Sequence, residues 1–279
     1  MKYLSRGATL LLVLAASFPL LADGAKGSFR FGKVHFEPVD ALAFQVPGKD
    51  AKPVTLVALT NFKIDRPAVM EAVDTYGALA VQSFNADKGS FVIVRLNTPT
   101  QCGLGGVLDQ GAKQTDLGDS FTAKTTSMTA TRVAGSCATD KPGKMFDDAY
   151  EFKFSYDLPI TAIPKPIELP AGGGEPGATY TTLVKAIQTA NWDAAHLHLA
   201  EESVPATKPK ASEMKEYFRG IGLNYPKTVK VIGGLMKPTR ANLNIQGTDR
   251  DDKKINGVVA MKKVDGQWRV IDQSFYFAQ

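Results

Sequence analysis

The sequence contains few of the residues that most often do chemistry in proteins, with 2 cysteines and 3 histidines in 279 residues. It has no Gly-x-Ser-x-Gly turn of the kind that presents a catalytic serine. The glycines at positions 103, 105 and 106 are not followed by the Lys-Ser/Thr pair of a phosphate-binding loop, and the dinucleotide fingerprint is absent. A hydrolase of the serine or cysteine type and a nucleotide-binding enzyme are therefore unsupported. We nominate no catalytic residue and expect no cofactor.

Metal sites have equally little support. His196 and His198 are two residues apart in a segment of helical composition, so their side chains point about 200° apart and cannot share one ion. The acidic cluster Asp249, Asp251 and Asp252 lacks the central Gly and the distal Glu of a calcium-binding loop. We interpret this cluster as a solvated turn and predict no metal site.

The two cysteines, Cys102 and Cys137, form an even count, which is typical of a structural disulfide in an exported protein. A reactive thiol pair is the alternative, but the two residues do not have a close redox spacing. We therefore predict a Cys102–Cys137 disulfide.

The mature chain also lacks an apolar run of the roughly 20 residues that a membrane span needs. An uncharged stretch, residues 8–22, follows Lys2 and Arg6 and leads into small residues at positions 22, 24 and 25. This order is typical of a secretory signal peptide. We predict that residues 1–25 are removed and that the mature chain is periplasmic or secreted; a retained anchor is the alternative. The formal net charge of +5 is mild and does not indicate a nucleic-acid partner.

A change of composition divides the mature chain. Residues 164–177 contain 4 prolines and 3 consecutive glycines, which continue neither a helix nor a central strand, so we predict a linker. Residues 26–163 are predicted to be a mainly β domain, sandwich-like and with one disulfide, because segments such as 150–158 alternate apolar and polar residues. One helix is expected at 67–74, and the Gly-rich segment 102–118 is expected to be a loop.

Residues 178–279 show a different pattern. Helical stripes of apolar residues occur at 180–187, 194–202 and 212–221. Asp265-Gly266 is a two-residue hairpin signal between the last two of four strand-like segments. Those segments are 228–235, 240–247, 254–263 and 267–277.

Two short motifs in this region carry a family resemblance: Ala-Asn-Trp-Asp-Ala-Ala at 190–195, and the hairpin at 264–272 that contains Trp268. Together with the order of helices and strands, they resemble the nuclear-transport-factor-like superfamily, which includes the ketosteroid isomerases. The resemblance implies a cone-shaped α+β domain in which three helices pack on a curved antiparallel sheet and leave a pocket at the open end. The predicted fold class is therefore α+β, with a sandwich-like β domain followed by this cone. Nothing in residues 26–163 resembles a known family.

The resemblance suggests where a ligand would bind. The aromatic candidates would form the apolar walls of a pocket, and Asp272 lies on the last strand, where the family often places pocket residues. Ordinary core packing is the alternative for the aromatic residues and the one we favour, because the stripe at 214–221 has core spacing. The candidate ligand-binding residues are Trp192, Tyr217, Phe218, Trp268 and Asp272.

The same region carries 15 basic and 10 acidic residues, including Lys230 and Lys237. A surface for an acidic partner or an anionic envelope polymer is one interpretation. Ordinary solubilising charge is the alternative that we favour, because strand lysines face solvent in any case.

We expect an exported, non-catalytic binding or accessory protein of the cell envelope. Its cone would hold a small ligand or peptide, and its β domain would contact another envelope protein. The alternatives are an isomerase-type or cyclase-type enzyme that uses the cone, and an immunity-type protein that neutralises a secreted toxin. A polar dyad inside the cone would favour the enzyme.

Overall fold

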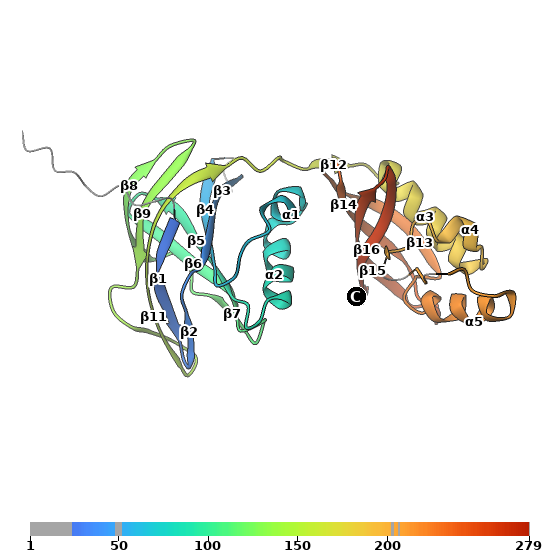
Figure 1. The fold of residues 1–279 in the computed structure, drawn as a ribbon, viewed down its shortest axis with the longest axis horizontal. Helices are drawn as coiled ribbons and strands as arrows, with labels where there is room; N and C mark the ends of the chain where they lie inside the picture. The colour runs from blue at the N-terminus through green and yellow to red at the C-terminus, as the bar shows by residue number, and fades with distance from the viewer. Residues whose placement is uncertain (1–23, 48–51, 202–203, 206, 279) are drawn as a thin grey trace, which may run out of the picture.

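The computed structural model describes residues 24–47, 52–201, 204, 205 and 207–278 (Figure 1). Residues 1–23 of the predicted signal peptide lie outside the described residues. The chain is mostly β, with 49% of it in strands and 20% in helices. We refer to residues 24–161 as the N-terminal half, to 162–166 as the connecting segment and to 167–278 as the C-terminal half.

The N-terminal half contains one mixed sheet of 11 strands and two helices. The helices are α1 (Arg66–Glu71) and α2 (Thr75–Asn85). The strands, in chain order, are β1 (Gly24–Phe31), β2 (Val34–Phe36), β3 (Asp40–Pro47), β4 (Pro53–Thr60), β5 (Phe91–Thr98), β6 (Gln101–Leu108), β7 (Lys113–Asp116), β8 (Phe121–Met128), β9 (Arg132–Ala138), β10 (Gly143–Met145) and β11 (Asp148–Thr161).

This sheet closes on itself through β11. The strand pairs antiparallel with β1 and with β9, and its end, at Ile160 and Thr161, pairs in parallel with Ala43 and Phe44 of β3. From β3 the sheet runs through β4, β5, β6, β8 and β9 back to β11. The closed sheet encloses a core that includes alternate residues of β11, as the period of two predicted.

The predicted disulfide is confirmed: Cys102 of β6 and Cys137 of β9 are bonded at an S–S distance of 2.05 Å. Both residues are fully buried in the enclosed core. The bridge joins two strands that are separated in the sheet by β8.

Strands β3 to β6 are apolar on both faces because each face meets a different core. Val57 and Leu59 of β4 point into the enclosed core, whereas Ala58 belongs to a second cluster on the outer face. Val69 of α1 and Leu79 of α2 complete that outer cluster. The prediction that 54–59 and 91–94 are strands buried on both faces is confirmed.

The C-terminal half contains an antiparallel sheet with three helices on one face (Figure 1). Residues from helices and sheet form one buried cluster, and Asp265 and Gly266 have the positive φ angles of the expected hairpin turn. The helices are α3 (Gly174–Gln188), α4 (Trp192–Ala195) and α5 (Ala211–Gly222), and the strands are β12 (Ile167–Leu169), β13 (Thr228–Met236), β14 (Arg240–Thr248), β15 (Lys254–Val264) and β16 (Gln267–Phe277).

The predicted fold class is wrong. An α+β chain with a β-sandwich and a helix-packed cone was expected, whereas the chain is mostly β and its largest unit is a single mixed sheet of 11 strands. Alternation identifies the residues that face a core, but it does not specify which strands pair. Closure of the sheet depends on only two residues of β11 against β3, too short a contact to recognise in the sequence. In the C-terminal half, α4 has 4 residues, where a helix over 194–202 was expected.

Two local predictions in the N-terminal half are also wrong. The segment 102–118 is not a loop, because it contains most of β6 and all of β7. Glycine suits β6 because a Cβ on Gly106 would lie 2.3 Å from the carbonyl oxygen of Phe91. The helix expected at 67–74 is α1, which ends at Glu71, and α2 was not predicted at all.

Candidate binding groove

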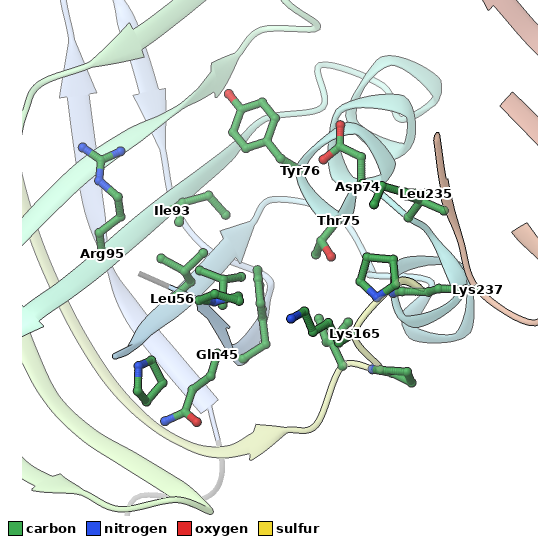
Figure 2. A pocket seen from close by; sticks show the side chains of 18 of the residues that line it. Gln45, Leu56, Asp74, Thr75, Tyr76, Ile93, Arg95, Lys165, Leu235 and Lys237 are labelled. Carbon is green, nitrogen blue, oxygen red and sulfur yellow. The ribbon is translucent and has the colours of Figure 1, made fainter. Parts of the chain in front are cut away.

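The largest of three hollows on the described surface is a groove of about 1240 Å³ on the outer face of the N-terminal sheet (Figure 2). Phe44, Leu56 and Ile93 form its floor, one each from β3, β4 and β5. The start of α2 forms one wall, and the connecting segment with the end of β13 forms the other.

The groove exists because the two helices cover only part of the outer face. They pack on the Leu42, Ala58 and Phe91 end of the cluster and leave the other end open. The opposite wall contains Pro164 and Pro166, which fix the local backbone and lack an N–H group. A mainly apolar hollow with a few polar groups is the usual form of a ligand site.

At one end of the groove, Arg95 is fully engaged by carboxylates. Its Nη2 lies 2.7 Å from Oδ1 of Asp116, and its Nε lies 2.9 Å from Oδ1 of Asp119. Burial alone would lower the pKa of Arg95, but the hydrogen bonds to the two carboxylates raise it. The hydrogen bond from Arg95 in turn lowers the pKa of Asp116. This cluster stabilises the end of the groove and offers no free charge to a ligand.

At the other end, Lys237 is only 4% exposed, which corrects the expectation that it faces solvent. Its ammonium donates a hydrogen bond of 2.8 Å to the carbonyl oxygen of Met70 in α1, and burial lowers its pKa. Among the described residues, Lys165 has no hydrogen-bond or ion-pair partner, and Figure 2 shows its side chain between the sheet residues and the start of α2.

The charges that line the groove are balanced. Its three cationic side chains, Arg95, Lys165 and Lys237, are matched by three carboxylates. The carboxylates are Asp74, Asp116 and Glu168. The arrangement therefore suits an apolar occupant with little net charge.

The structure brings three of the predicted ligand-binding residues together. The ring centroids of Trp192 and Tyr217 are 5.6 Å apart, and those of Tyr217 and Phe218 are 5.4 Å apart. The indole of Trp192 also stacks on the imidazole of His196 at 5.5 Å. Trp192 and Phe218 are buried in the C-terminal cluster, and Tyr217 packs against it.

Trp268 and Asp272 do not join them in a pocket. Trp268 is 2% exposed in the same buried cluster, with the Lys263 ammonium 5.4 Å from the centre of its ring. Asp272 is exposed and accepts a hydrogen bond from the backbone N–H of Gln273. None of the five predicted residues lines the groove or either of the two smaller hollows, one beside Tyr225 and one beside Asp40.

The groove residues were missed because their sequence signals match ordinary core. Leu56 and Ile93 lie in short apolar runs that predicted buried strands, which they are. Lys237 was grouped with surface lysines because burial of a strand lysine depends on a contact with α1, far away in the sequence.

The histidines of the C-terminal half are bonded to backbone. Nδ1 of His196 donates to the carbonyl oxygen of Trp192 at 2.9 Å, and Nδ1 of His198 donates to that of Trp268 at 3.0 Å. In the part of the chain that the structure describes, no group of three or more His, Cys, Asp and Glu side chains is arranged to hold a metal ion.

No model of a known protein family matches this chain, and no curated protein matches it. The resemblance of residues 178–279 to the nuclear-transport-factor-like superfamily stays a prediction. None of the helices that the structure describes has the length and apolar character to cross a membrane.

Proposed function

We propose that this chain is an exported, non-catalytic binding protein of the cell envelope whose ligand occupies the groove between the N-terminal sheet, α2 and the connecting segment. The observation that carries the proposal is the groove itself. Its volume of about 1240 Å³ and its floor of Phe44, Leu56 and Ile93 suit an apolar ligand.

Export is supported by two independent features. The charged start and the apolar run of residues 2–22 have the order of a signal peptide. The Cys102–Cys137 disulfide is typical of an oxidising compartment outside the cytoplasm.

A dye-binding experiment tests the groove. The probe is 8-anilinonaphthalene-1-sulfonate, which fluoresces when it enters an apolar site. The variant Thr75→Trp places a large ring in the groove wall at the start of α2. We expect it to weaken dye binding at least about ten-fold, which corresponds to about 1.4 kcal/mol.

The matched control is Ser212→Trp, which adds the same ring to an exposed position at the start of α5, away from the groove. It should bind the dye as the unmodified protein does. If Thr75→Trp also binds the dye unchanged, the groove is not the apolar binding site and the proposal is wrong. Mass spectrometry of protein purified from its native host would then identify the ligand class directly.

A further inference from the structure

The sheet of the C-terminal half has a second face, which the helices do not cover (Figure 1). Strands β14, β15 and β16 place nine residues on it in three rows, because residues paired across antiparallel strands point to the same face. We call these nine residues the amide face. The rows are Gln246, Asn256 and Tyr276; Asn244, Val258 and Ser274; and Asn242, Ala260 and Asp272.

The amide face contradicts ordinary strand composition. Its four amide side chains occupy exposed or half-buried positions in the middle of the sheet, although Asn is depleted in strands. The intervening residues of β14, Ala241, Leu243 and Ile245, are all buried and apolar as expected. Local choices that break a folding rule without a structural gain mark functional sites.

The amide groups are also free to bind. Within the described residues, the side chains of Asn242, Asn244, Gln246 and Asn256 make no hydrogen bond to the protein itself. Each amide provides two donors and one acceptor oxygen in a fixed plane. Adjacent hydroxyl groups of a sugar, each both a donor and an acceptor, complement that pattern.

Two further features narrow the ligand. Tyr276 is 60% exposed, so its ring is available to pack against the apolar face of a sugar ring, while its hydroxyl stays in water. Asp272 is the only charged residue among the nine, so the amide face offers no array of cations to a polyanion. A protein partner would need an apolar and aromatic centre, whereas the centre here is Asn244 and Val258.

The amide face is continuous with the groove. Asn242 pairs with Leu235 of β13, and Leu235 lines the groove. A chain-like ligand on the amide face would therefore pass the mouth of the groove.

From this chemistry we propose that the amide face binds a neutral oligosaccharide chain. The amides of β14 and β15 hydrogen-bond its hydroxyl groups, and Tyr276 packs on one of its rings. This site is separate from the apolar groove, and it does not depend on the function proposed for the groove.

A glycan array tests the proposal with the full mature chain. The array carries neutral hexose and N-acetylhexosamine oligosaccharides together with sulfated and uronic-acid oligosaccharides. We expect binding to neutral members and at least a ten-fold loss in the double variant Asn244→Thr/Gln246→Thr. Threonine has the higher strand propensity, so the variant should melt no lower than the unmodified protein.

Two control variants complete the design. Gln114→Thr removes an exposed amide from β7 in the N-terminal half and should bind glycans normally. Thr75→Trp, which fills the groove, should also bind them normally, so failure of the groove and failure of this site are distinguishable. Absence of binding to every neutral glycan, binding to acidic glycans alone, or equal binding by the double variant would each overturn the proposal.

Discussion

The ammonium of Lys237 donates a 2.8 Å hydrogen bond to the carbonyl oxygen of Met70, a residue 167 positions earlier in the chain. Met70 belongs to α1 of the N-terminal half, whereas Lys237 follows β13 of the C-terminal half. Nearby, Nε of Arg240 lies 4.0 Å from a carboxylate oxygen of Glu71. These contacts join the two halves at one end of the groove.

We expect Lys237→Met to loosen that joint. The substitution keeps an unbranched side chain but removes the donor, and loss of one hydrogen bond of about 1 kcal/mol raises an opened population about five-fold. Limited proteolysis with proteinase K should then cut residues 164–177 faster, since exposed Pro/Gly-rich backbone is a preferred site of cleavage. Lys230→Met, at an exposed position of the same strand, is the control. Equal cleavage rates in the two variants would show that the hydrogen bond does not hold the halves together.

A second prediction concerns the ion pair of Asp40 and Arg66, which joins β3 to α1. Arg66 donates to the two carboxylate oxygens of Asp40 at 3.0 and 2.8 Å. Burial alone would raise the pKa of Asp40, but the hydrogen bonds from Arg66 and from the backbone N–H groups of Ile64 and Ala41 lower it overall. The carboxylate therefore stabilises the fold above its unfolded pKa of about 3.9, and this stabilisation is lost as the pH falls through the lower folded value.

Asp40→Asn should reduce the free energy of unfolding by about 1–3 kcal/mol at pH 7, as measured by urea denaturation. The difference from the unmodified protein should shrink as the pH is lowered below about 4. Glu151→Gln is the control, because Glu151 and Arg30 form an exposed pair, which is worth less than about 1 kcal/mol. A difference that stays constant down to pH 2 would contradict the linkage to Asp40.

The third prediction concerns the disulfide. Its two cysteines are 35 positions apart, and closing a loop of that length stabilises a fold by about 3–4 kcal/mol in the chain-entropy model. The double variant Cys102→Ala/Cys137→Ala should lose at least that much in urea denaturation, because both sites are also fully buried. Thiol labelling of the unreduced, unfolded protein should find no free cysteine, and two labelled cysteines would refute the bridge.

The sequence predicted the features that rest on local pattern. The alternation in β11, the Asp265-Gly266 turn and the positions of the last four strands depend on residues close together in the chain. Closure of the N-terminal sheet and burial of Lys237 depend on residues more than 100 positions apart. No periodicity in either segment encodes such a contact, so neither the closed sheet nor the groove could be predicted.

The helix α2 shows a different limit. Its sequence, TYGALAVQSFN, includes Gly77 and Val81, which lower helix propensity. Only Leu79 and Ser83 are buried, so the apolar stripe that reveals a helix is nearly absent. The helix is stabilised by packing on the outer face of the sheet, as where Tyr76 meets Phe91 edge-on at 5.0 Å. That packing partner is visible only in the structure.

The last prediction decides between the two roles considered for Trp268. The side chain is 2% exposed and belongs to the buried cluster of the C-terminal half, so a structural role is the one that its surroundings support. Trp268→Ala should reduce the free energy of unfolding by about 3–5 kcal/mol, the usual cost of truncating a buried aromatic residue. Trp192, the remaining tryptophan, reports the unfolding of the same half by fluorescence. Leu223→Ala, at a residue that is 69% exposed, should change stability by less than about 0.5 kcal/mol. If Trp268→Ala instead leaves the melting temperature unchanged, Trp268 is not core. Loss of a co-purifying small molecule from that variant would then assign it to ligand binding.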